Sequence, residues 1–170
     1  MTDSERVASR FDIQGILESV APIRMGHIHD SYISTWQTRL GLVRYLHQRI
    51  NNKIFPNVKE LMSNLRLITE HLRENSTPDE ESLVLVSANN GQDTWVDSDG
   101  AHWRTFKYIE NTEVFNHCPN TEHAFELGKA FADFVLRLRG LPASSLSVTI
   151  PNFFHAPTRV EQMKNSAASD

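Results

Sequence analysis

The fold of this chain is decided by residues 25–55, which read MGHIHDSYISTWQTRLGLVRYLHQRINNKIF. Gly26 can take backbone angles that other residues avoid, and the polar residues after it indicate a tight turn. Residues 32–36 are β-branched or aromatic, which is typical of a strand. Residues 39–41 suit a hairpin connection, and residues 43–50 read as a second strand. The stretch therefore predicts a polar turn followed by a two-stranded hairpin.

The second strand of this hairpin has two different faces, because successive side chains of a strand point to opposite sides. One face carries Tyr45, His47 and Arg49, and the other carries Leu46, Gln48 and Ile50. Such a hairpin can close over an anionic ligand, since turn amides face inward and an arginine at the strand end supplies a fixed charge.

The flanking sequence predicts an α+β fold with an antiparallel sheet of five strands and one inserted helix. Asn57 is a good N-cap for a helix over residues 58–74, whose apolar residues recur at steps of three and four. A short helix is expected over residues 4–11, capped by Ser4. The other three strands of this sheet are expected over residues 15–23, 83–86 and 102–109, and an additional short strand is expected over residues 94–96.

After Glu110 the pattern of short strands gives way to a polar connector and a long amphipathic segment. A polar connector covers residues 111–120, and Thr121 can cap a helix through Arg139 with an apolar face wider than one small sheet could cover. Residues 144–151 read as loop, and the chain is expected to end in a polar tail after His155. We therefore expect a first domain over residues 1–110 and the beginning of a second over residues 111–170.

Composition excludes several classes of protein. The 170 residues include 17 Lys and Arg against 21 Asp and Glu, so the net charge is −4, which argues against nucleic-acid binding by bulk positive charge. Cys118, the single cysteine, fits a reducing compartment. No apolar run approaches the ~20 residues of a membrane span, and the N-terminus lacks an apolar signal core. We expect a cytoplasmic protein with neither a membrane nor a nucleic acid as partner.

Four runs in register, GHIHDSY, YLHQRINNKIF, LMSNLRLITEHL and HWRTFKYIE, resemble the N-terminal half of one kinase family. It is the aminoglycoside phosphotransferase and choline-kinase superfamily, in the branch close to N-acetylhexosamine 1-kinase. The resemblance extends from about Phe11 to Arg159, and chains of that family are about twice as long. It implies a kinase-like small lobe over residues 1–110, then a hinge and the first helices of an incomplete large lobe.

The resemblance also implies site residues. Arg49 stands where the family has a cation that contacts nucleotide phosphates, although a solvated arginine at a strand end is the simpler interpretation, and Gln48 is the alternative register. Glu60, or less well Asn64, would be its partner on the helix. The expected nucleotide-binding residues are Gly26 and Arg49, together with Lys107, Tyr108, Ile109 and Glu110 of the hinge, where backbone groups would hold adenine.

The histidines near Gly26 are open to three interpretations. His27 would contact the acceptor sugar by resemblance to the hexosamine-kinase branch, whereas a solvated loop histidine is the simpler interpretation. The pair His27 and His29 lacks the further donors that a metal site needs. His29 and His47 also depart from the residues usual in the branch.

The catalytic apparatus of the family is not found in this sequence. Phosphoryl transfer needs a base for the acceptor hydroxyl and carboxylates that hold Mg²⁺. In the family both lie on an H-x-D…N loop and a later I-D strand, and neither pattern follows Glu110. Ala156 also replaces the acid of an FHD-like segment at residues 153–156. No residue is assigned as catalytic base, and ATP with Mg²⁺ is the implied cofactor without magnesium ligands in this chain.

The parent activity implied by the resemblance is ATP-dependent phosphorylation of a sugar hydroxyl, such as that of an N-acetylhexosamine. Two alternatives remain at this point: a non-catalytic module that binds a nucleotide or a partner, and one half of a split kinase. The partners implied are a nucleotide, a sugar, and either a C-terminal half or a second copy of the chain.

Overall fold

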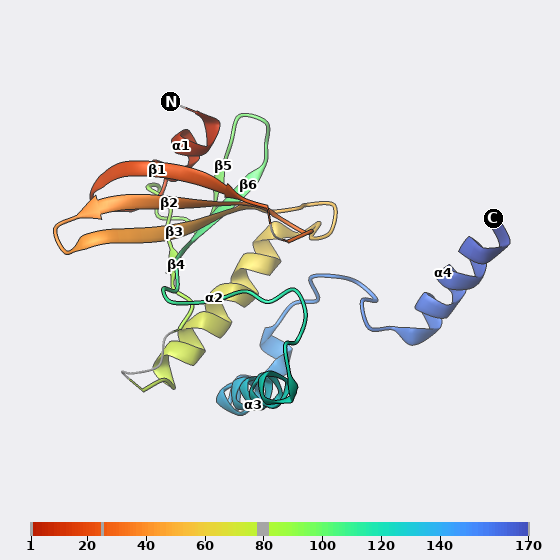
Figure 1. Cartoon of the computed structure of the whole chain (residues 1–170). Helices are drawn as coiled ribbons and strands as arrows, with labels where there is room; N and C mark the ends of the chain where they lie inside the picture. The colour runs from red at the N-terminus through yellow and green to blue at the C-terminus, as the bar shows by residue number, and fades with distance from the viewer. Residues whose placement is uncertain (1, 25, 78–81, 170) are drawn as a thin grey trace.

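The computed structural model describes residues 2–24, 26–77 and 82–169, so Met25 at the head of the hairpin stretch lies outside the described residues. The chain forms an α+β fold, as predicted (Figure 1). In chain order its elements are α1 (Asp3–Ala8), β1 (Ile16–Ile23), β2 (Asp30–Thr38), β3 (Gly41–Arg49), α2 (Val58–Glu74), β4 (Leu85–Val86), β5 (Trp95–Val96), β6 (His102–Lys107), α3 (Thr121–Arg137), a 3₁₀ turn (Ala143–Ser145) and α4 (Ala156–Ser169).

The sheet is antiparallel, in the order β1-β2-β3-β6-β4, and the short β5 pairs with β6 outside this path. The predicted hairpin is confirmed: β2 and β3 pair from Asp30 with Arg49 to Thr38 with Gly41, so two residues connect them. Gly41 has φ +110°, a conformation that favours glycine. One helix, α2, is inserted between the third strand and β4, as expected.

The two faces of the sheet are covered by different helices, which Figure 1 shows on opposite sides of it. On one face, which we call the α1 face, Val7, Ala8 and Phe11 pack with Trp36 and Trp103. On the other, the α2 face, Val58 and Met62 of α2 pack with Ile50, Leu85 and their neighbours. The alternation of side chains along β3 therefore assigns His47 and Arg49 to the α1 face and Gln48 to the α2 face.

Several expected boundaries were wrong: the strand expected over residues 102–109 ends at Lys107, and the helix expected through Arg139 ends at Arg137. The first helix begins one residue earlier than Ser4, because Thr2 accepts from the Glu5 amide and Glu5 returns the bond in a capping box. It ends at Ala8, and Phe11 lies beyond it in a bridge to Ala88. The strand expected over residues 83–86 is paired only at 85–86, and Leu83 and Val84 are exposed rather than buried.

The C-terminal part projects from the sheet. Contacts between α2 and α3 gather at the C-terminal end of α3, where His71 Nε2 lies 3.1 Å from the carbonyl oxygen of Arg137. The polar tail expected after His155 is wrong, because these residues form α4, with Pro157 in its first turn, where proline is tolerated. Figure 1 shows α4 at the end of a long connection, apart from the sheet. Within the described ranges, every helix is too short or too polar to cross a membrane.

Candidate functional site

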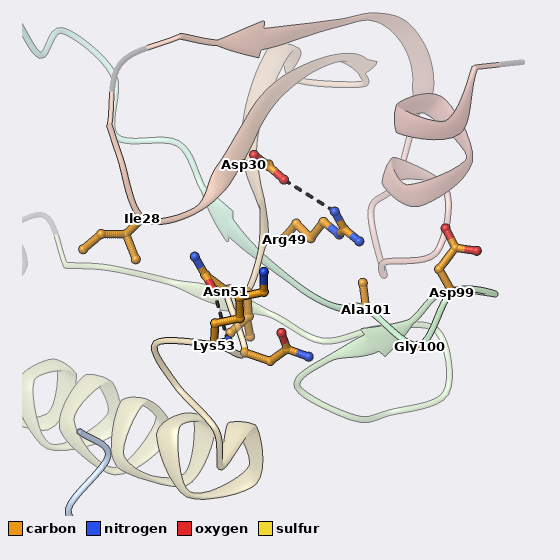
Figure 2. A pocket seen from close by; sticks show the side chains of 10 residues that line it. Ile28, Asp30, Arg49, Asn51, Lys53, Asp99, Gly100 and Ala101 are labelled. Atoms are coloured by element: carbon orange, nitrogen blue, oxygen red, sulfur yellow. Dashed lines mark hydrogen bonds and ion pairs between the residues drawn. The ribbon is translucent and has the colours of Figure 1, made fainter. Parts of the chain in front are cut away.

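A polar cavity of about 420 Å³ lies where β2 begins and β3 ends (Figure 2). Arg49 and the following Asn51 and Lys53 line it from one side, and Asp99 and Gly100 of the β5–β6 turn line it from the other. These groups offer two cations and several amides, which suits an anionic ligand. Asp30 and Asp99 bring two carboxylates to the same cavity, so its formal charge is balanced and an anion would rely on local contacts with Arg49, Lys53 and the amides rather than on net charge.

Arg49 is held by a weak ion pair. Its Nη1 atom lies 3.7 Å from Asp30 Oδ2, and the two side chains are 45% and 67% exposed. Exposed pairs of this kind contribute little, because both groups remain hydrated. Arg49 can therefore exchange Asp30 for a more highly charged anion at small cost.

Neither partner expected on α2 contacts Arg49. The side chain of Arg49 belongs to the α1 face, and α2 packs on the opposite face of the sheet. The amide of Asn64 instead holds the backbone of Ser147, donating to its carbonyl at 2.8 Å and accepting from its N–H at 2.9 Å. The acid that does pair with Arg49 comes from the adjacent strand, so a phosphate contact by Arg49 stays a prediction.

The turn that precedes β2 lies at the same end of the sheet. Gly26 has φ +109°, and both Gly26 and His27 are exposed. Because Asp30 is in register with Arg49, this turn emerges beside the end of β3. Ile28 lines the cavity, whereas His27 is outside its lining, so the sugar contact expected of His27 also stays a prediction.

The expected hinge lines a second, smaller cavity. Lys107, Tyr108 and Ile109 enclose about 190 Å³ together with Ser82 and Val84. Two of the hinge amides are already engaged, because Lys107 N–H donates to the Val84 carbonyl and Tyr108 N–H donates to the Arg44 carbonyl, each at 2.9 Å. A bound base would therefore use amides beyond Tyr108 or the hinge carbonyls.

Glu110 has a structural partner of its own. Its carboxylate forms an ion pair with Arg44, whose guanidinium lies 4.4 Å from the centre of the Tyr108 ring. The hydrogen bond from Arg44 lowers the pKa of Glu110. These contacts fix the course of the chain as it leaves the sheet.

The two cavities lie at opposite ends of the β3–β6 ladder. Tyr45 pairs with Lys107 at the hinge end, and Arg49 pairs with Trp103 at the other. Four residues of strand separate these pairs, which corresponds to roughly 13 Å. The structure thus places the turn that carries Gly26 and His27 at the same end of the sheet as Arg49, and places the expected hinge residues at the other end of the β3–β6 ladder.

Sequence reasoning missed a third set of residues, on the α2 face between these ends. Arg104 of β6 donates from Nε and Nη2 to Gln48 Oε1, at 3.1 and 3.0 Å. Its Nη2 atom also lies 3.2 Å from His29 Nε2. Burial lowers the pKa of Arg104 to about 10, and burial, then the charge of Arg104, lowers the pKa of His29. A cation inside an aromatic strand was the signal in the sequence that could have indicated this cluster.

Magnesium does not fit the residues at hand. In the described part of the chain, no three side chains of the His, Cys, Asp or Glu type gather in a way that could hold a metal ion. Asp30, the acid nearest to Arg49, is engaged with that arginine.

No family model matches this sequence.

Proposed function

We propose that this chain is the nucleotide-binding part of a phosphotransferase that acts on a sugar hydroxyl, with ATP as the donor. The observation that carries the proposal is the topology: five strands in one antiparallel path, with a single helix inserted after the third and packed on one face. That arrangement is the one expected for a kinase-like small lobe. Cavities at the predicted phosphate and hinge ends of the same ladder give further support.

A split enzyme is the second candidate. The observation in its favour is α3, of which no residue is buried although its sequence is strongly amphipathic. A separate chain that carries the catalytic loop could cover this helix and complete the cleft. The non-catalytic module remains the alternative if no such chain binds.

Nucleotide binding is the test of the proposal. We expect the isolated chain to bind ATP with a dissociation constant in the millimolar range, about −4 kcal/mol. In a complete kinase of this family the large lobe would enclose the nucleotide from the other side, and this chain is expected to carry only the beginning of that lobe. Arg49→Ala should weaken binding by about 1 kcal/mol, roughly fivefold, through the loss of one charge-assisted contact at an exposed position.

The control for this titration is Arg39→Ala, which removes an exposed arginine from the opposite end of the hairpin. Calorimetry or NMR should detect the difference between the two variants. Equal affinities for both would remove Arg49 from the site, and no ATP binding by the wild type at high protein concentration would refute the proposed function.

Catalysis by the isolated chain is expected to be unmeasurable. Neither a base for the sugar hydroxyl nor carboxylates for Mg²⁺ are assigned in this sequence, and phosphoryl transfer depends on both. Phosphorus NMR of ATP, Mg²⁺ and N-acetylhexosamine with purified protein provides the measurement. Sugar phosphate formed by the wild type and lost in Arg49→Ala would show that this expectation is wrong.

A further inference from the structure

The cluster of Arg104, Gln48 and His29 on the α2 face has more hydrogen-bond donors than acceptors. An arginine side chain can only donate, and so can a backbone N–H group. His29 receives both: Arg104 Nη2 lies 3.2 Å from its Nε2, and Asn51 N–H lies 3.2 Å from its Nδ1. A neutral imidazole accepts at one nitrogen only, so in either tautomer one N–H of His29 faces another donor.

The rest of the cluster cannot supply the missing acceptor. The amide of Gln48 is oriented by its own contacts, because its Nε2 donates to Ser31 Oγ at 3.3 Å and its Oε1 faces Arg104. Ser31 in turn donates to the His29 carbonyl at 3.5 Å. Gln48 therefore accepts hydrogen bonds from two of the guanidinium nitrogens, and it provides no acceptor for the donors that meet at His29.

The charge of Arg104 has no counterpart either. Among residues 2–24, 26–77 and 82–169, no aspartate or glutamate forms an ion pair with it. Partly buried cations are normally paired, because removal from water penalises the charged form. Aromatic rings lie beside both residues. Phe106 lies 5.3 Å from the guanidinium in a cation–π contact, which attracts the cation without supplying a negative charge, and Phe55 is stacked 5.5 Å from the His29 ring.

We propose that Arg104 and His29 form an oxyanion site on the α2 face, with Gln48 positioning the guanidinium, and that its ligand is a phosphoryl group. An anionic oxygen beside the two nitrogens, which lie 3.2 Å apart, can accept from both Arg104 Nη2 and His29 Nε2–H and supplies the missing negative charge. Both residues keep part of their surface exposed. The choice of a phosphoryl group rests on the proposed function, whereas the site itself rests on the surplus of donors.

The protonation of His29 reports on occupancy of the site. The charged groups that face it are Arg104 of β6, which lowers its pKa, and Asp30 at the start of β2, which raises it. A bound phosphoryl group adds negative charge and an acceptor, and therefore favours the protonated ring. Binding should raise the pKa of His29 and should itself weaken as the pH rises.

The experiment is an NMR titration of the His29 ring protons with pH, with and without inorganic phosphate. We expect phosphate to raise the pKa of His29 in the wild type, and Arg104→Met to reduce phosphate affinity at least tenfold. Arg66→Met is the matched control, because Arg66 is an arginine whose charge Asp93 and Glu70 already neutralise. His29→Phe keeps the stack on Phe55 and removes the ring N–H, so it should also weaken phosphate binding if Arg104→Met fails to fold.

The source of the phosphoryl group is distinguished by repeating the titration with ATP and with an N-acetylhexosamine 1-phosphate. A raised pKa of His29 with either ligand supports the site and identifies its source. An unchanged pKa with phosphate, or equal phosphate affinity in the wild type and Arg104→Met, overturns the proposal. If ATP binding depends on Arg49 and is unaffected by Arg104→Met, and neither phosphate nor the sugar phosphate raises the pKa of His29, the proposed function stands and this site is refuted. A phosphate response without any ATP binding supports the site and refutes the nucleotide proposal.

Discussion

His47 is buried in the α1 face between two hydroxyl groups. Its Nε2 lies 2.7 Å from Ser34 Oγ, and its Nδ1 lies 2.7 Å from Thr105 Oγ1. Trp36 Nε1–H donates to the same serine oxygen at 2.8 Å. The network is satisfied when the imidazole is neutral, and burial lowers the pKa of His47 from 6.5 to about 4.

This histidine makes the stability of the fold depend on pH. The unfolded chain binds a proton at His47 near pH 6.5, whereas the folded chain binds it only near pH 4. As the pH falls through this window the unfolded state is favoured, so stability is lost, by about 3 kcal/mol in all. We expect His47→Gln to reduce this loss, which urea unfolding at a series of pH values measures.

His117→Gln is the control, because His117 is exposed and its removal should leave the pH dependence unchanged. His29, whose pKa is also lowered, remains in both variants and maintains a smaller slope of the same sign. An identical pH dependence in wild type and His47→Gln would show that His47 is protonated in the folded chain.

The two arginines of the sheet show which residue-level features could be predicted from sequence. Arg49 was identified from its position at a strand end, and it does lie in a polar cavity. Alternation assigned it to the same face as His47, yet the sequence could not indicate which face α2 would cover. Arg104 was missed because its partners are distant in sequence: Gln48 lies opposite it on β3, and His29 lies in the turn before β2, and only the pairing of the strands brings them together.

At the scale of elements, features that depend on neighbouring residues were predicted well, and features that depend on pairing between distant residues were predicted less well. The β2–β3 hairpin and α2 were predicted well, since turn chemistry, capping by Asn57 and helical periodicity act within a few residues. The strand around Leu85 was overestimated because its pairing depends on Thr105 and Phe106, some twenty residues later. The helix α4 was missed because its sequence has a weak apolar pattern and none of its residues is buried.

The entry to β1 depends on a glycine. Gly15 has φ +131°, and a Cβ atom there would lie 2.5 Å from the carbonyl oxygen of Gln37 on β2. Gly15→Ala therefore combines an unfavourable backbone conformation with a clash against the neighbouring strand, and we expect it to destabilise the fold by about 3 kcal/mol. Chemical unfolding followed by tryptophan fluorescence provides the measurement.

Gly91→Ala separates the two contributions to that loss. Gly91 also has a positive φ, +77°, but no atom lies within 4 Å of the Cβ that would be added. Its substitution should cost only the backbone preference, about 1 to 2 kcal/mol. Equal destabilisation by the two variants would mean that β1 shifts and relieves the clash.

At the scale of the whole molecule, the sheet with α1 and α2 has its own core, whereas α3 lies outside it. The two clusters of buried apolar residues belong to the first 110 residues. The change in composition after Glu110 predicts a domain boundary there, and that boundary stays a prediction. The breadth of the apolar face of α3 indicated that its partner is not the small sheet, and no residue of α3 is buried.

The exposed face of α3 leads to the last prediction, which is that the isolated chain self-associates through a second copy of itself. Phe125, Phe131 and Val135 are 70%, 65% and 63% exposed, and Phe134 is 43% exposed. Each apolar side chain of this size contributes about 1.5–3 kcal/mol when it is fully buried, so several of them in water favour association. Light scattering coupled to gel filtration should show a dimer or a larger species.

The variant Phe131→Ser with Phe134→Ser should make the chain more monomeric and leave the sheet folded, as judged by the near-ultraviolet spectrum of Trp36 and Trp103. Leu40→Ser is the control, because Leu40 is 98% exposed at the hairpin turn, where a single apolar side chain offers little surface. A monomeric wild type together with an unfolded double variant would place these phenylalanines in an internal core and refute the division into two lobes. Selective capture of a C-terminal kinase half by the wild type, with no self-association, would instead assign the same face to a split enzyme.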